Sequence, residues 1–264
     1  AAVHSDEQTA YLHRIGHVGQ RVAELQLALA SREDLVDFAP EPISAGDLAQ
    51  WKHALQERAL HAFDRLLRVR SDLAESDREL ADKIVSARGS LASVLDELLP
   101  GAGADAVKIR HHGDFHLGQM LIVKDDVFII DFEGEPRRNM KERRRKAPAA
   151  RDVAGLIRSI DYSATGALER AVKSAPDDEG KIARALDGWR DASVAAFLAG
   201  YRRSLTDRRL WPSSTQDADR LLDFFLLEKA FYEIEYELAH RPDWLRVPLA
   251  GTWRILSRSE RAVS

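Results

Sequence analysis

The sequence predicts an α+β protein that is mostly α-helical, with a small β-hairpin near the middle of the chain. Apolar residues recur at helical spacing near the N-terminus, as in the series Ile15, Val18 and Val22, and again beyond about residue 150. From Val107 the pattern changes to the alternation of apolar and charged residues that a half-buried strand requires. Two short apolar runs then flank a polar turn, which indicates the hairpin.

Periodicity and start signals place the individual elements. Ser44, followed three residues later by Asp47, is a helix-capping pattern. Helices are expected at about residues 5–31, 44–66, 76–99, 152–174, 179–205 and 215–240. Strands are expected at 107–110, 120–123 and 127–130. Because no internal repeat or long linker interrupts this order, we expect a single domain over residues 1–264, with its β-hairpin region at about 107–133.

Composition excludes several classes of protein. The 264 residues are 45% hydrophobic and 31% charged, as in ordinary globular proteins, and the net charge of −4 argues against a general nucleic-acid binder. No apolar run approaches the roughly 18–20 residues that a membrane span needs. The absence of cysteine excludes disulfides, zinc-thiolate sites, iron–sulfur clusters and a cysteine nucleophile. We expect a cytoplasmic protein that binds neither nucleic acid nor a membrane.

The hairpin is expected to bring oxygen ligands together at its open end. If residues 125–126 form the turn, Met120 lies opposite Asp131 and Gln119 emerges on the neighbouring strand. Cross-strand neighbours are roughly 5 Å apart, so an amide oxygen and a carboxylate converge there. Asp114 lies in the loop that leads into this end. Two carboxylates and an amide oxygen are hard ligands that suit Mg²⁺.

This pattern is typical of a phosphoryl-transfer site. A loop aspartate orients the acceptor hydroxyl, and an amide and an acid at the next strand end hold the metal ions. Asp114 would be the catalytic base or orienting residue, with Gln119 and Asp131 as metal ligands. His112 would brace the loop. The expected cofactors are ATP and Mg²⁺.

The same residues carry a resemblance to a known family. The segments His-Gly-Asp-Phe-His-Leu-Gly-Gln (112–119) and Ile-Ile-Asp-Phe-Glu-Gly-Glu-Pro (129–136) resemble those of the maltokinases, which have the aminoglycoside-phosphotransferase-like kinase fold. Further matching segments bring the resemblance to residues 17–256, and they lie at 151–155, 158–162, 228–233, 241–244 and 247–249. The resemblance implies ATP-dependent phosphorylation of maltose to maltose 1-phosphate, on the route from trehalose to glycogen. It also implies a possible partner, a fused or associated trehalose synthase.

The resemblance also implies that the chain is a C-terminal kinase lobe. Kinases of this fold carry a strand-borne lysine, its glutamate partner and a phosphate-covering loop in an N-lobe. No such segment precedes the helices, so the N-lobe is expected to be absent and the chain to be nearly inactive alone. The Gly-Ala-Gly run at 101–103 enters a strand rather than following one, so it is interpreted as a connector and not as a nucleotide loop.

Several supporting residues have more than one interpretation. His116 could orient the loop or touch the sugar, and Glu133 could assist the metal or hold the basic segment that follows. Asp152 could cap its helix or prop the catalytic loop. The run His112-x-Asp114-x-His116 could also be taken for a metallo-hydrolase cluster, although such sites need further ligands from other segments.

The acceptor side is the least determined part of the site. Seven basic residues lie between 137 and 146, either as a solvated face or as an acceptor-side segment in which Arg144 meets sugar or phosphate oxygens. Tyr232, Glu233 and Glu237 are candidate sugar contacts or simply core residues. Two alternative functions remain: a kinase for another acceptor, such as glucosamine or an aminoglycoside, and a non-catalytic docking module of a trehalose synthase.

Overall fold

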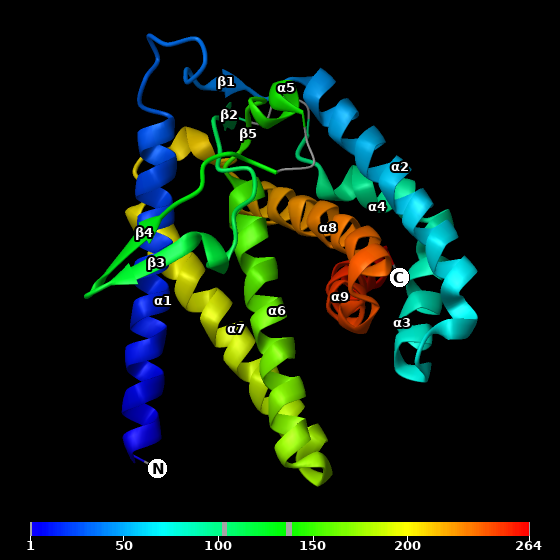
Figure 1. Ribbon diagram of the computed structural model, residues 1–264. Coiled ribbons are helices and arrows are strands. Elements are labelled where there is room, and N and C mark those ends of the chain that lie inside the picture. The colour runs from blue at the N-terminus through cyan, green and yellow to red at the C-terminus, as the bar shows by residue number, and fades with distance from the viewer. Residues whose placement is uncertain (1, 102–104, 136–138, 264) are drawn as a thin grey trace. The chain divides into compact units, whose positions relative to one another are not determined.

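The computed structural model describes residues 2–101, 105–135 and 139–263, and the side chains within 7–258. The chain divides into two compact units, each built from two separate segments (Figure 1). Unit 1 contains 1–41 and 107–210, and unit 2 contains 42–106 and 211–264. Since each unit is assembled from two distant segments, no linker marks a boundary in the sequence. The mostly helical α+β class is confirmed, whereas the single kinase lobe stays a prediction.

Unit 1 is built on three long helices. They are α1 (Ala2–Leu29), α6 (Ala150–Ser174) and α7 (Glu179–Ser204), and α7 packs against both of the others. Short 3₁₀ helices η4 (Pro176–Asp178) and η5 (Arg208–Leu210) flank α7. The helices α1 and α7 approach so closely that a Cβ built at Gly200 would lie 1.9 Å from the Gly16 carbonyl oxygen. Only glycine at position 200 permits this backbone contact.

The strands of unit 1 form two small antiparallel sheets. In one, the strand order is β1 (Glu41–Pro42), β2 (Val107–Ile109) and β5 (Ala147–Pro148), with β2 in the middle and antiparallel to β5. Of the two residues of β1, Glu41 belongs to this unit. In the other, β3 (Met120–Val123) and β4 (Asp126–Ile129) form the hairpin, with η3 (Leu117–Gln119) directly before it. The helix α5 (Met140–Arg143), which periodicity did not indicate, lies within the basic segment.

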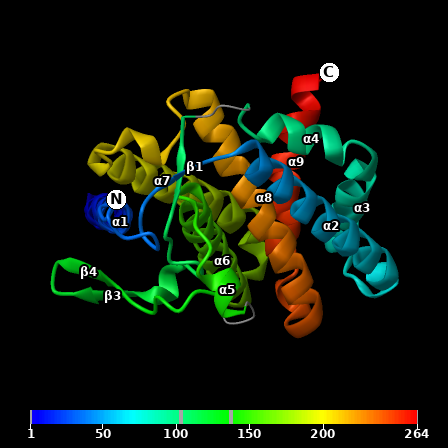
Figure 2. The ribbon, with the colours of Figure 1, turned by 90° about the horizontal axis from the view of Figure 1, so that it is seen from above.

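The described part of unit 2 is helical apart from its connections and Pro42 of β1 (Figure 2). It contains α2 (Ala45–Val69), α3 (Glu75–Ser86), α4 (Leu91–Leu98), α8 (Thr215–His240) and α9 (Arg246–Val263). The 3₁₀ helices η1 (Arg70–Asp72), η2 (Ala87–Gly89) and η6 (Pro242–Trp244) connect them. The expected capping box of Ser44 and Asp47 is present at the start of α2. Among the described residues, no helix combines the length and apolarity needed to cross a bilayer.

Two sequence-based boundaries were wrong. The helix expected at 76–99 is divided into α3, which ends at Ser86, and α4, which starts at Leu91; the 3₁₀ helix η2 between them ends at Gly89, a poor helix former. No helix was expected beyond residue 240, whereas the structure contains α9 there. Pro248 is its third residue, where the missing N–H leaves no hydrogen bond unmade.

The hairpin register also differs from the expected one. The strands end at Val123 and Asp126, so the turn is Lys124-Asp125, and Met120 lies opposite Ile129 rather than Asp131. Lys124 adopts the left-handed conformation, with φ 58°, that tight hairpin turns require. Asp126 is therefore not in the turn but is the first residue of β4, where its side chain accepts hydrogen bonds from Arg21 of α1.

We expect Gly200→Ala to lower the free energy of unfolding by about 1–3 kcal/mol, because the added methyl group forces α1 and α7 apart. The matched control is Gly188→Ala on the same helix, where a Cβ meets nothing within 4 Å. That change should stabilise the protein slightly through helix propensity, by up to about 1 kcal/mol. Urea unfolding of both variants checks the pair, and equal effects would contradict the close-packing argument.

Candidate active site

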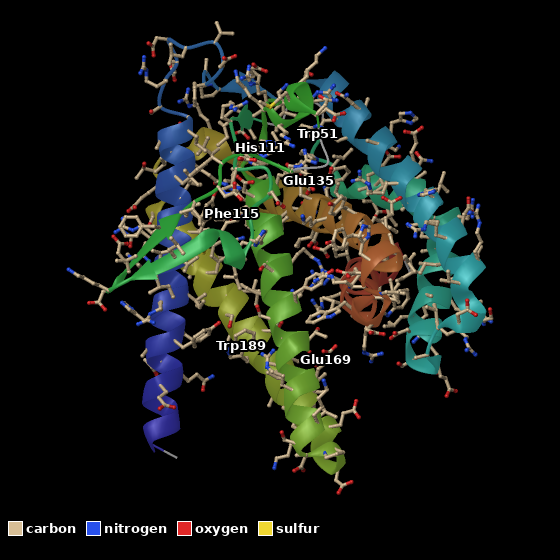
Figure 3. The ribbon with its side chains drawn as sticks, viewed as in Figure 1. Trp51, His111, Phe115, Glu135, Glu169 and Trp189 are labelled. Atoms are coloured by element: carbon tan, nitrogen blue, oxygen red, sulfur yellow. The ribbon has the colours of Figure 1, made fainter. Side chains whose placement is uncertain are left out.

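A buried carboxylate at the start of α6 holds the loop that contains Asp114. The two oxygens of Asp152 accept the backbone N–H groups of His112 and Gly113, at 2.8 and 3.1 Å. The ring of His111 lies beside the same carboxylate, with Nδ1 3.5 Å away. Figure 3 labels His111 and Phe115 near this end of α6. Of the two roles expected for Asp152, these contacts support the one that props the loop.

The contacts of Asp152 also decide its charge. Burial on its own would raise the pKa of this carboxyl. The His111 ring and the two backbone N–H donors outweigh burial, however, and hold the pKa below its ordinary value. The carboxylate therefore stays ionised at neutral pH, and both of its oxygens remain acceptors for the loop.

His112 joins this loop to the end of the hairpin. It is buried, and its Nε2 lies 2.8 Å from the carbonyl oxygen of Ile130, to which it donates. Its ring packs against those of Phe115 and Phe132, each with centroids 5.1 Å away. These contacts are those of a bracing residue, the role predicted for His112.

Gln119 and Asp131 meet at the open end of the hairpin. The side-chain amide of Gln119 donates to Asp131 Oδ2 at 3.0 Å. The backbone N–H of Ile130 donates to the backbone carbonyl oxygen of Gln119, also at 3.0 Å. The chain is left-handed at Asp131, with φ 64°, two residues after the end of β4. A non-glycine residue in this conformation is uncommon, and aspartate is one of the residues that tolerate it best. The expected juxtaposition therefore exists although the register differs.

His116 is fixed by the 3₁₀ turn that leads into the hairpin. Its Nδ1 accepts the N–H of Gly118 at 3.0 Å, so the neutral ring carries its proton on Nε2. That nitrogen lies 3.4 Å from the Gln119 amide. His116 thus orients the turn and borders Gln119, which supports the orienting interpretation.

Asp114 is partly buried between two anchored neighbours. Gly113 is bound to Asp152 on one side, and on the other Phe115 is buried with its carbonyl close to Gly155 of α6. A Cβ built at Gly155 would lie 2.6 Å from that oxygen, so glycine is required for the loop to sit this close. Farther along, the Leu117 N–H donates to the Ser159 hydroxyl at 3.0 Å. Asp114 therefore projects from a loop fixed at both ends.

The donor set fits a hard divalent cation. A carboxylate and an amide group lie within hydrogen-bonding distance, and the amide can turn its oxygen toward the position that its nitrogen now faces. The metallo-hydrolase alternative has no such support, because His112 and His116 are engaged elsewhere. Within the described residues, no three His, Asp or Glu side chains are grouped to hold a metal ion.

Other predicted residues of unit 1 lie outside this cluster. Glu133 is exposed and approaches Arg143 at 4.0 Å, which supports its alternative role of holding the basic segment. Arg144 is exposed, and its carbonyl accepts from Arg110. Lys146, expected among solvated or acceptor-side cations, instead binds two carbonyl oxygens of the loop before β1 and the carboxylate of Glu41 in β1. Residues 137 and 138 of this segment, and 102 and 103 of the Gly-Ala-Gly run, lie outside the described residues.

The three predicted sugar contacts belong to unit 2, on α8. Glu233 and Glu237 are buried, and Glu237 accepts from Arg241 through both oxygens, at 3.0 and 2.7 Å. The ring of Tyr232 carries the cations of Arg58 and Lys229, 5.6 and 4.9 Å from its centroid. The structure thus places them in a different unit from Asp114, Gln119 and Asp131.

Sequence reasoning missed the contacts between the hairpin and α1. Asp126 accepts from Arg21 Nε and Nη2, at 2.7 and 3.0 Å, and lies 3.1 Å from His17 Nε2. The Arg21 guanidinium first, then the Val127 N–H and His17, lower the pKa of Asp126 to about 2. No local pattern joins residues 105 positions apart, so the sequence offers no signal for this pair.

The proteins similar to this chain are sugar kinases. They include glucosamine kinases of Streptacidiphilus jiangxiensis, 30% identical over 236 residues, and of Mycolicibacterium smegmatis, 28% identical over 247 residues. Among solved structures, a glucosamine kinase in complex with glucosamine, ADP and inorganic phosphate superposes with a TM-score of 0.74 at 26% identity over 97% of this chain. A second glucosamine kinase structure gives 0.72 at 27% identity over 94%. No protein-family model matches the chain.

These findings correct the expected family. The similar proteins are named glucosamine kinase, so the resemblance to maltokinases was wrong. The two matches cover 88% and 92% of this chain. The chain spans 46% and 53% of the length of these two relatives, and 58% and 54% of the two solved chains.

We expect Asp152→Asn to lower the free energy of unfolding by about 1–3 kcal/mol at neutral pH, because the amide nitrogen faces a backbone N–H that loses its acceptor. The folded-state pKa of Asp152 is lowered, so its contribution to stability is full above the unfolded pKa of about 4 and is lost as the pH falls through the folded value. The variant should lack this part of the acid dependence.

Urea unfolding at neutral and acidic pH measures both effects. The matched control is Asp187→Asn, which changes an exposed carboxylate of α7 and should alter neither quantity. An Asp152→Asn protein with unchanged stability would contradict the loop-anchoring role.

Proposed function

We propose that this chain carries the phosphoryl-transfer site of an ATP-dependent sugar kinase whose acceptor is glucosamine. The observation that supports it most is the meeting of Gln119 and Asp131 at the hairpin end, 3.0 Å apart, beyond a loop that holds Asp114 by anchors on both sides. The similarity to glucosamine kinases supports the acceptor. The structure complexed with ADP supports the nucleotide.

The chemistry asked of these residues is alignment and charge neutralisation. In transfer of the γ-phosphoryl group, a sugar hydroxyl oxygen forms a bond to phosphorus, the bond to the ADP oxygen breaks, and the hydroxyl proton is released. Asp114 orients that hydroxyl and accepts its proton. Since phosphoryl transfer needs little covalent help from the protein, fixing the Asp114 loop to α6 is itself the catalytic contribution.

Gln119 and Asp131 would hold Mg²⁺. A bound Mg²⁺ neutralises phosphate charge and orients the phosphate oxygens for in-line displacement. The residues fit this task, because the Asp131 carboxylate is exposed and the Gln119 amide lies beside it. Once the Gln119 amide turns its oxygen toward the ion, the Nε2–H of His116 would donate to that oxygen and hold the amide in this orientation.

An amino sugar asks for a different recognition chemistry from that of a neutral sugar. Glucosamine carries an amine that is protonated at neutral pH, and a buried carboxylate is the natural partner for an ammonium group. On α8, Glu233 is a buried carboxylate of this kind, whereas both oxygens of the buried Glu237 already accept from Arg241 and the ring of Tyr232 already faces the cations of Arg58 and Lys229. These three residues stay our predicted acceptor contacts.

The proposal is tested by an acceptor screen on the complete gene product. With ATP and Mg²⁺, glucosamine should give the highest kcat/KM, and glucose or N-acetylglucosamine a much lower one, because neither carries the positive charge. Release of ADP measures the turnover. Preference for an aminoglycoside would favour the alternative acceptor, and turnover of none of these would contradict the proposal.

We expect Asp114→Asn and Asp131→Asn each to lower kcat roughly a hundredfold or more, because they remove the proton acceptor and a metal ligand. The control is Asp125→Asn, which makes the same chemical change in the exposed hairpin turn. Glucosamine phosphorylation is measured for all three, with circular dichroism to establish folding. A folded Asp114→Asn protein with normal kcat would dismiss the assigned role.

A further inference from the structure

The hairpin that carries Gln119 and Asp131 is attached to α1 by an ion pair near its turn. Asp126, the first residue of β4, accepts two hydrogen bonds from the fork of Arg21 and lies within hydrogen-bonding distance of His17. Glu24, one turn along α1, binds the third side of the same guanidinium. Arg21 is therefore held in place by its own helix while it binds the hairpin.

Beyond its base, which His112 binds at Ile130, the described hairpin has little apolar burial to hold it. Leu121, Ile122 and Phe128 are 49%, 58% and 53% exposed, and Val123 is also exposed. Val127 is the buried side chain of the two strands, and β4 is the strand that lies against α1. A two-stranded ribbon with so little apolar burial is marginally stable by itself. The ion pair with α1 therefore contributes much of the interaction that orients the hairpin.

The ladder connects this attachment to the candidate site. Four residue pairs run from Val123 opposite Asp126 to Met120 opposite Ile129, and the next bond joins Ile130 to Gln119. Asp131 follows directly. The base of the attachment is firm, because α1 is packed backbone to backbone against α7 at Gly16 and Gly200. A displacement of the ribbon near Asp126 is therefore passed to Gln119 and Asp131.

We propose that Arg21 and Asp126 are positioning residues, whose ion pair between α1 and the hairpin sets the place of Gln119 and Asp131. This inference rests on the proposed function, since it assigns the pair a role in presenting metal ligands. Both side chains are partly exposed, so the pair contributes little to global stability. Its loss should appear as local opening of the hairpin rather than as unfolding.

The test compares two neighbouring aspartates in the complete gene product. Asp126→Asn removes the charge that Arg21 binds, while Asp125→Asn makes the same change one residue away, in the turn. The first readout is amide hydrogen exchange over residues 119–131, which needs neither metal nor substrate. The second is the dissociation constant of Mn²⁺ in the presence of ADP, from water-proton relaxation.

We expect Asp126→Asn to speed exchange of the ladder amides and to weaken Mn²⁺ binding, each by between about twofold and thirtyfold, the usual range for residues that couple to a site without touching the ligand. Asp125→Asn should change neither quantity. Arg21→Gln should reproduce the effect, and Arg21→Lys should restore part of it, because lysine keeps the charge but not the fork.

Unchanged exchange and unchanged Mn²⁺ affinity in Asp126→Asn would overturn the proposal. A lowered melting temperature would overturn it as well if amide exchange over residues 119–131 rose no more than exchange in the rest of the chain, because the substitution would then have acted on global stability alone. Failure of the proposed function looks different: the wild-type protein would then phosphorylate no amino sugar. The exchange measurement would still decide whether Arg21 and Asp126 hold the hairpin.

Discussion

The buried carboxylate of Asp152 is the constraint on which the candidate site depends. Two backbone N–H groups of the loop have this carboxylate as their acceptor, and its charge makes both hydrogen bonds strong. The same face of α6 then meets the loop twice more, at Gly155 and at Ser159. Because positions 152, 155 and 159 recur at helical spacing, one rigid helix face fixes the loop that holds Asp114.

The other half of the site is held by a different helix. The hairpin is bound to α1 by the ion pair of Arg21 and Asp126. Both α1 and α6 pack against α7. The relation between the loop and the hairpin end therefore depends on the packing of three helices in unit 1. His112 adds a direct connection, since its ring lies between Phe115 of the loop and Phe132 after the hairpin.

The change from maltokinase to glucosamine kinase shows what the motifs encode. In the proposed function the residues at 112–119 and 129–136 serve transfer of a phosphoryl group, and that chemistry makes the same demands whichever sugar hydroxyl accepts it. Acceptor choice depends instead on differences in contact that such motifs do not contain. The similar proteins therefore correct the family while leaving the expected roles of Asp114, Gln119 and Asp131 as they were.

The sequence by itself determined the helical class, the capping of α2, the place of the hairpin, and the polar residues at its open end, because periodicity, caps and apolar runs are local properties. Tertiary structure decided the rest. The turn lies at Lys124-Asp125, and Asp126 is bound by a helix more than a hundred residues earlier in the chain. Asp152 holds the loop at His112, and Lys146 binds the Ala39 carbonyl oxygen, because helix packing brings these distant segments together. Which distant donor a charged side chain meets depends on helix packing, and local sequence does not contain that information.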